Sequence, residues 1–168
     1  PIRQELLSGN PQKALAFTGL SNEKPVIMVI GGSLGAVAVN NAVRAILPEL
    51  LKDFQVIHLC GKGKLDSSLT DTKGVQYEYI KDELADLFAL ADIVISRAGA
   101  NAICEISALK KPNLLIPLSA RASRGDQILN ARSFEKLGYS MVLEEEEITD
   151  EKLLDTIHQL YKNRHTFE

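Results

Sequence analysis

Two glycine-containing segments of this sequence could each hold a negatively charged ligand. GGSLGA covers residues 31–36, and SRAGA covers residues 96–100. Each follows a short apolar run and precedes a helical pattern, so each is expected to open a helix. Glycines let the backbone approach a ligand closely, and the first N–H groups of a helix have no partner within it. The pattern predicts two anion-binding helix starts, with Ser33 adding a hydroxyl; a tight turn without a ligand is the alternative.

A carboxylate follows the second of these segments. Counting from Ala100, the apolar residues Ile103, Ile106 and Leu109 mark the side of the helix that faces the core. Glu105 lies off that side, one turn in, where a carboxylate can accept hydrogen bonds from a pair of vicinal hydroxyls. It would repel phosphate. The alternative is an exposed glutamate that only aids solubility.

A polar segment, residues 119–131, runs into another helical pattern with Asp126 and Gln127 at its start. Side chains at a helix start commonly cap it, and capping is the alternative for Asp126. Gln127 is a weaker cap and could instead bind sugar hydroxyls. Two anion-binding helix starts, a carboxylate suited to ribose and a pair of side chains suited to hydroxyls together predict a nucleoside diphosphate-sugar as the ligand.

The glycine segments do not fit the common nucleotide motifs. No Gly-Lys-Ser/Thr follows residues 31–36, which excludes a P-loop. In a GxGxxG register from Gly31, Ser33 and Ala36 occupy two of the glycine positions, and the next strand ends without an acidic residue for a nicotinamide ribose. A dehydrogenase is therefore disfavoured. With no nucleophile–base pair, no metal-ligand cluster and no implied cofactor, the sequence predicts a donor-binding portion of an active site.

Composition sets the class of protein. The 168 residues suffice for one substantial core, and 45% hydrophobic with 24% charged residues is typical of a globular chain. A net charge of -3 gives no reason to expect nucleic acid. Cys60 and Cys104 lack CxxC partners, which suits a reducing compartment, and no apolar run reaches the ~20 residues of a membrane span. The acidic run 144–147 is interpreted as a solvated strand end. Because the sequence begins at Pro1, we expect a piece of a longer protein.

The elements that must position these residues alternate along the chain. Apolar, β-branched runs predict strands covered on both faces, and weaker runs predict strands nearer the edges. The strong runs are 26–30, 54–60, 92–96 and 113–117, and the weaker ones 75–80 and 140–144. Helices are predicted at 36–51, 83–91 (capped by Asp82), 125–137 and 150–162 (capped by Thr149), after a helical lead-in at 2–7 and 11–18.

This alternation predicts right-handed βαβ units and hence a single doubly wound α/β domain with a parallel sheet over residues 1–168. Ligands of such domains bind beyond the carboxyl ends of the strands. The loops there are 31–36, 61–64, 80–83, 97–101 and 117–127.

Three motifs carry a resemblance to a known family. VIMVIGGSLGAVAVNNAV, SRAGANAICEISALKKPNLLIPL and DQILNA, in this order and at this spacing, resemble the C-terminal domain of the MurG family, and the similarity runs along nearly the whole chain. These bacterial glycosyltransferases add N-acetylglucosamine to lipid I, undecaprenyl-pyrophosphoryl-muramoyl-pentapeptide, to give lipid II. The resemblance implies the GT-B fold, two Rossmann-like domains around a cleft. This chain would be the UDP-N-acetylglucosamine donor domain, with residues 1–24 leading in from an interdomain linker and the N-terminal acceptor domain absent.

The resemblance also implies roles for single residues. Ser33 would lie beside the diphosphate, and the backbone of Ile80 would meet uracil. Glu105 would bind the ribose hydroxyls, and Gln127 those of the sugar. Asp126, where the family has Gln or His, is grouped with the sugar contacts. The N–H groups that would hold the α-phosphate are those of Ala100, Asn101 and Ala102.

The implied enzyme is an inverting transferase that needs no metal, with its general base on the missing domain. It would be cytoplasmic and peripheral on the cytoplasmic face of the membrane. Two other functions stay open: a soluble, non-catalytic donor-binding subunit of a split N-acetylglucosaminyltransferase, and a UDP-sugar 2-epimerase-like domain. The first would work only with a separate membrane-bound acceptor chain, whereas the second would convert UDP-N-acetylglucosamine without an acceptor.

Overall fold

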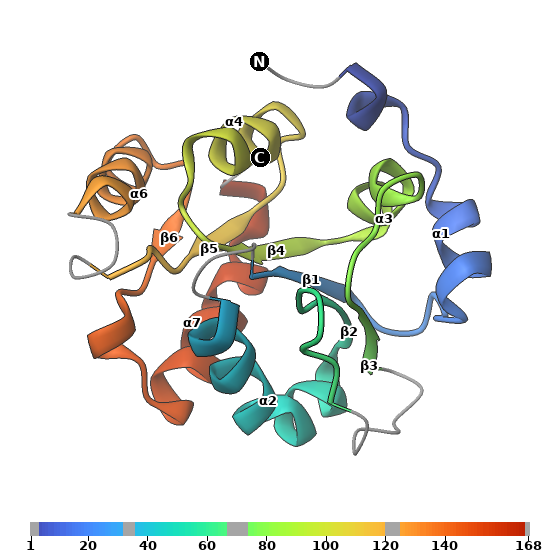
Figure 1. Cartoon of the computed structure of the whole chain (residues 1–168), viewed down its shortest axis with the longest axis horizontal. Coiled ribbons are helices and arrows are strands. Elements are labelled where there is room, and N and C mark those ends of the chain that lie inside the picture. Colours follow the sequence, from blue (N-terminus) through green and yellow to red (C-terminus); the bar gives the residue numbers. More distant parts are fainter. Residues whose placement is uncertain (1–3, 32–35, 67–73, 120–124, 167–168) are drawn as a thin grey trace.

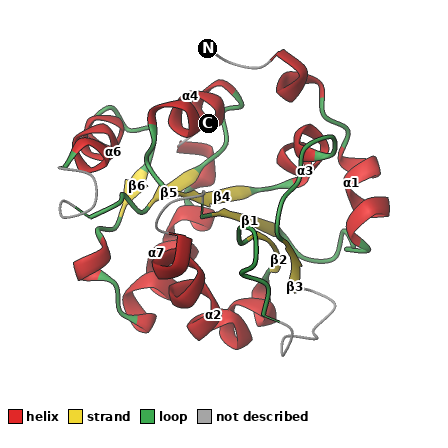
Figure 2. Cartoon of the chain, viewed as in Figure 1, coloured by secondary structure: helices red, strands yellow, loops and turns green. Residues whose placement is uncertain are grey.

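The computed structural model describes residues 4–31, 36–66, 74–119 and 125–166. Its centre is a six-stranded sheet with the order β3-β2-β1-β4-β5-β6, and all of its strand pairs are parallel (Figures 1 and 2). The strands are β1 (Val26–Ile30), β2 (Gln55–Leu59), β3 (Gly74–Tyr77), β4 (Ile93–Ser96), β5 (Asn113–Leu115) and β6 (Met141–Val142). The predicted doubly wound α/β class is confirmed, and the two weaker strands form the two edges.

Helices cover both faces of this sheet (Figure 1). On one side lie α1 (Pro11–Thr18), α3 (Leu84–Leu90) and α4 (Ala100–Ala108), and on the other α2 (Ala36–Asp53) and α7 (Asp150–Lys162). Helix α6 (Asp126–Lys136) precedes β6, and short 3₁₀ helices occupy η1 (Gln4–Ser8), η2 (Glu145–Glu147) and η3 (Arg164–Thr166). Among the described residues, no helix has both the length and the apolar character needed to cross a bilayer.

Strand β1 shows why the central runs are apolar throughout. Ile27 and Val29 pack into the core beneath α2 and α7, whereas Val26 and Met28 pack into the core on the side of α1, α3 and α4. Successive side chains of a strand point to opposite faces, so a strand covered on both sides must be apolar at every position. The same packing includes Leu6 and Ala14, which join the predicted helical lead-in to the core.

The structure confirms one of the predicted helix caps and contradicts another. Thr149 caps α7 as predicted, with its hydroxyl accepting from the N–H of Lys152 at 3.1 Å. The prediction that Asp82 caps α3 is wrong, because a turn intervenes and Glu83 occupies the N-cap position. Asp126 is not a cap either: Gly125, at φ +85°, precedes α6 and Asp126 is the first residue within the helix.

The acidic run is not the solvated strand end that the sequence suggested. Its residues form η2, with Glu144 and Glu147 building a reciprocal capping box. Glu145 forms an ion pair with Arg97, while Glu144 and Glu147 both pair with Arg132 of α6. These carboxylates are paired with the guanidinium groups of Arg97 and Arg132, which lie outside the run. A local charge pattern cannot reveal such pairs.

Candidate functional site

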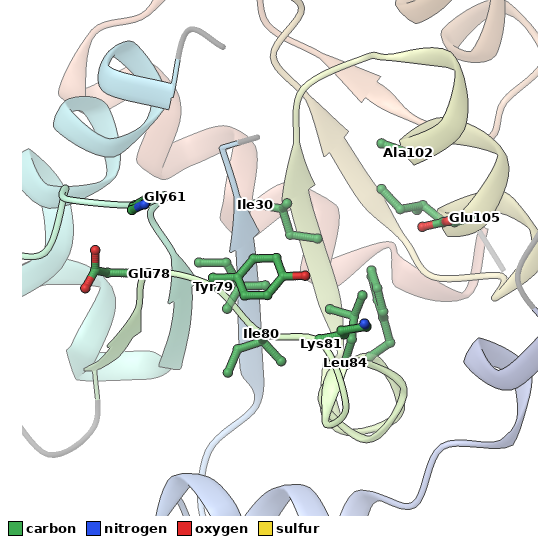
Figure 3. A pocket seen from close by; sticks show the side chains of 13 residues that line it. Ile30, Gly61, Glu78, Tyr79, Ile80, Lys81, Leu84, Ala102 and Glu105 are labelled. Carbon is green, nitrogen blue, oxygen red and sulfur yellow. The ribbon is translucent and has the colours of Figure 1, made fainter. Parts of the chain in front are cut away.

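A cavity of about 740 Å³ opens at the carboxyl ends of β1, β2 and β3 (Figure 3). It is bounded on the far side by α4, which follows β4, so it lies where the strand order reverses between β1 and β4. Open α/β sheets bind their ligands at this place. The lining residues are Ile30, Leu59, Gly61, Lys62, Glu78, Tyr79, Ile80, Lys81, Leu84, Phe88, Ala102, Glu105 and Ile106.

The lining combines an apolar floor with a charged rim. Ile30 and Phe88 contribute apolar surface to the lining, while Tyr79, which also lines the cavity, is 74% exposed. In Figure 3, Tyr79 and Ile80 lie between Glu78 on one side and Glu105 on the other. A largely apolar cavity with a few polar groups at defined places is typical of small-molecule sites. It can accept a flat ring and anchor the polar remainder of the same ligand.

The start of α4 forms one wall of this cavity. Gly99 is the N-cap residue in an extended conformation, and within the described structure no side chain caps the helix there. Ala100 and Asn101 are exposed at the first turn, and Ala102 lines the cavity. An uncapped helix start presents backbone N–H groups and a partial positive charge to an anion. This is the geometry expected of the second glycine segment.

Glu105 reaches the same cavity from the next turn of α4. Ile103 and Ile106 are 3% and 2% exposed on the core side, as their spacing predicts, and Glu105 is half-buried with its carboxylate toward the cavity (Figure 3). The structure therefore brings together Ile80, Ala102 and Glu105, which come from segments about 20 residues apart. Their individual roles stay predictions.

Gln127 and Asp126 lie outside the cavity lining. The side-chain oxygen of Gln127 accepts from the backbone N–H groups of Ala98, at 3.2 Å, and Leu118, at 2.9 Å. Because both partners are donors, the amide oxygen must face them. The amide nitrogen then faces the start of α4, 3.8 Å from where a Cβ on Gly99 would lie. Asp126 is exposed beside it, and Ser33 falls outside the described residues.

A buried polar pair supports the loop after β2, and sequence reasoning missed it. The imidazole Nε2 of His58 lies 2.7 Å from Oδ1 of Asn40, and Nδ2 of Asn40 donates to the Cys60 carbonyl at 2.8 Å. Burial, assisted by the nearby charge of Arg44, lowers the pKa of His58 to about 4. The neutral imidazole thus ties α2 to the end of β2, just before Gly61 enters the cavity wall.

Lys62, Glu78, Tyr79 and Lys81 also line the cavity without having been singled out from the sequence. Position was the available signal for Lys62 and Lys81, since 61–64 and 80–83 were among the loops expected at the carboxyl edge. Glu78 and Tyr79 were instead expected within the strand 75–80, but β3 ends at Tyr77 and they follow it. Among the described residues, no group of three or more His, Cys, Asp or Glu side chains is arranged to hold a metal ion.

The strand order and the cavity at its switch point define a doubly wound, Rossmann-like α/β domain, in which ligands commonly bind at that point. Residues 26–168 match the glycosyltransferase family 28 C-terminal domain. The chain therefore belongs to glycosyltransferase family 28, through its C-terminal domain. This result confirms the family resemblance inferred from the three motifs.

Similar proteins agree with this assignment. A UDP-N-acetylglucosamine--N-acetylmuramyl-(pentapeptide) pyrophosphoryl-undecaprenol N-acetylglucosamine transferase of Lachnospira eligens is 65% identical over 99% of this chain and 48% of its own length. The protein of the same name from Lachnoclostridium phytofermentans is 62% identical, covering 99% and 47%. The crystal structure of Acinetobacter baumannii MurG shares the fold at a TM-score of 0.71, with 23% identity over 98% of this chain and 48% of that one. The chain thus spans about half the length of the curated relatives it matches.

Proposed function

We propose that this chain is the donor-binding domain of an inverting N-acetylglucosaminyltransferase that converts lipid I to lipid II in peptidoglycan synthesis. The observation that carries the proposal is the cavity at the carboxyl edge, to which Ile80, Ala102 and Glu105 all contribute. These residues are expected to meet three different parts of one nucleotide. The names of the relatives, which specify both UDP-N-acetylglucosamine and a pyrophosphoryl-undecaprenol acceptor, support the same function.

Each part of the nucleotide has a chemically suitable partner. The apolar floor suits a base ring, whose polar edge would bond to the backbone of Ile80. Glu105 would accept hydrogen bonds from the two ribose hydroxyls. The first N–H groups of α4, from Ala100, Asn101 and Ala102, would bind the α-phosphate. In this arrangement the negatively charged phosphate would lie at the start of α4 and not beside the Glu105 carboxylate.

The sugar would lie beyond the diphosphate, toward α6. Gln127 already uses its amide oxygen within the protein, so its amide nitrogen would donate to a sugar hydroxyl. Asp126 is exposed at the same helix start and would accept from a second hydroxyl. Ser33 is proposed to lie beside the diphosphate from the other glycine segment.

In the proposed reaction, the acceptor hydroxyl attacks the anomeric carbon and UDP leaves from the opposite side. The N–H groups of α4 would stabilise the charge that develops on the departing diphosphate. The general base and the lipid I site would belong to the other half of the longer protein, an N-terminal acceptor domain. That protein would act as a peripheral enzyme on the cytoplasmic face of the membrane.

Calorimetric titration of this chain with UDP, UDP-N-acetylglucosamine, UDP-glucose and NAD tests the proposal. We expect binding of UDP and UDP-N-acetylglucosamine, weaker binding of UDP-glucose, and no binding of NAD. Binding of NAD without binding of UDP would contradict the donor assignment. Conversion of UDP-N-acetylglucosamine by the longer protein without acceptor would instead identify an epimerase. Transfer only after addition of a separate acceptor chain would identify a split enzyme.

A further inference from the structure

A buried arginine occupies the segment that leads into α4. Arg97 directly follows β4 and is 5% exposed. Its Nη1 donates to the carbonyls of Ile116 and Pro117, both at 3.2 Å, and its Nη2 lies 2.6 Å from Oε1 of Glu145. The guanidinium therefore joins the end of β4 to the loop after β5 and to η2. A side chain that is buried and bonded in this way is not presented to a ligand.

The same segment is also bonded to α6. Ala98 is fully buried, and both polar groups of its backbone bond to α6 side chains: its N–H to the Gln127 oxygen and its carbonyl to Nδ2 of Asn130, at 3.2 Å each. The two residues before Gly99 are thus fixed from outside α4. Because Gly99 is the N-cap residue of α4, their position determines where the first turn of the helix begins.

The η2 segment forms ion pairs both with the residue after β4 and with α6. Glu145 pairs with Arg97, while Glu144 and Glu147 pair with Arg132 of α6 at 2.6 and 3.2 Å. We refer to these five residues as the ion-pair clasp. Burying a charged pair yields little net stability, but removing one partner leaves a buried charge uncompensated. The largely buried Arg97–Glu145 pair of this clasp is therefore better suited to setting geometry than to stabilising the fold.

We propose that the Arg97–Glu145 pair is a positioning element for the donor, which sets the first turn of α4 relative to α6. This inference rests on the proposed function, because it takes a phosphate as the group bound at that turn. Glu145 and Arg97 touch no ligand in this arrangement. They act through Ala98 and Gly99 on the N–H groups that follow.

The experiment compares Glu145→Gln with Glu146→Gln. Both remove one charge from η2, but Glu146 is exposed and has no ion pair within the described structure. Glu145→Asp is a milder variant that keeps the charge on a shorter side chain. Amide hydrogen exchange is measured first, without ligand. Exchange over residues 97–103 should rise in Glu145→Gln, rise less in Glu145→Asp and match wild type in Glu146→Gln, while β1 and β2 stay protected.

Ligand binding is measured on the same proteins with uridine and UDP. In Glu145→Gln, UDP should bind about tenfold more weakly, as expected for one impaired charge-assisted hydrogen bond, and uridine within about twofold of wild type. Glu146→Gln should bind both as wild type does. A merely structural role for Glu145 would weaken both ligands alike.

The outcomes distinguish a failure of the positioning inference from a failure of the proposed phosphate site. Unchanged exchange over residues 97–103 in both Glu145 variants overturns the positioning inference. Equal losses for uridine and UDP overturn it as well, because the phosphate would not be the group affected. If wild type binds UDP no better than uridine, the proposed phosphate site is wrong, and the exchange measurement still shows whether the pair holds the start of α4.

Discussion

Mild acid should destabilise this domain through His58. The imidazole is buried against Asn40, and its pKa is lowered to about 4 by burial, with a smaller effect of the nearby Arg44 charge. In the unfolded chain the same group would titrate near 6.5. Protonation is therefore favoured in the unfolded state. The contribution of the neutral imidazole is fully present above pH 6.5 and is lost as the pH falls toward 4.

The size of the effect follows from the two pKa values. One pKa unit corresponds to about 1.4 kcal/mol, so a shift of this size corresponds to a maximum loss on the order of 3 kcal/mol. At pH 5 the unfolded imidazole is almost entirely protonated and the folded one mostly neutral. The expected loss at that pH is about 2 kcal/mol. This is a substantial part of the stability of a domain of this size.

Urea unfolding at pH 7.5 and pH 5.0 measures this loss. Because carboxylates also contribute to acid destabilisation, wild type is compared with His58→Gln, which cannot be protonated. The drop in the free energy of unfolding should be about 2 kcal/mol smaller in the variant. An NMR titration of wild type should show the His58 imidazole neutral down to about pH 4.

His158→Gln is the matched control, because it removes a second imidazole whose pKa is shifted in the opposite direction to that of His58. Burial alone would lower the pKa of His158, but hydrogen bonds to Asp53 and the Leu154 carbonyl raise it overall. Its contribution is therefore lost as the pH rises, the opposite sign to that of His58. If wild type and His58→Gln lose the same stability on acidification, or if His58 titrates near its ordinary pKa, the reasoning from burial is wrong.

Three further predictions concern the donor site. Glu105→Ala should cost about 1.5–3 kcal/mol of UDP binding without unfolding the domain, since its side chain lies off the core side. In calorimetry, a loss of affinity for 2′,3′-dideoxy-UDP as large as the loss for UDP would contradict the ribose role. Gln127→Ala should weaken UDP-N-acetylglucosamine more than UDP and cost about 1–3 kcal/mol of stability, because the N–H groups of Ala98 and Leu118 lose their acceptor. Equal losses for the two ligands would argue against sugar binding by Gln127. This chain by itself should transfer no sugar to lipid I in a radiolabelled assay, and measurable turnover would show that the acceptor site lies within it.

Much of the fold is determined by local pattern. The run at 26–30 is apolar at every position and the run at 92–96 is apolar at 93–95, because strands covered on both faces have no solvent-facing side, and this identified the centre of the sheet. The helical spacing of Ile103 and Ile106 is likewise sufficient to place Glu105 off the core side. The glycine segments and their place after strands predicted a site at the carboxyl edge of the sheet, and the structure has a cavity there, next to the start of α4.

Local pattern was weaker at helix starts and in charged segments. Asp82 has the chemistry of a cap, but the chain makes a further turn before α3 begins. The acidic run has the composition of a solvated segment, although it is bonded to guanidinium groups from the end of β4 and from α6. In both cases the residue types were compatible with several structures, and neighbours from elsewhere in the chain selected one.

Only the tertiary structure decided which polar side chains meet. The spacing of apolar residues predicts which side of a helix or strand faces the core. It does not predict which other segments lie beside the end of that element. Arg97 and Glu145 are brought together because β5 and β6 lie successively beside β4, and Gln127 reaches Ala98 because α6 lies beside the start of α4. Such contacts depend on the placement and rotation of whole elements, which the packing of the entire core determines.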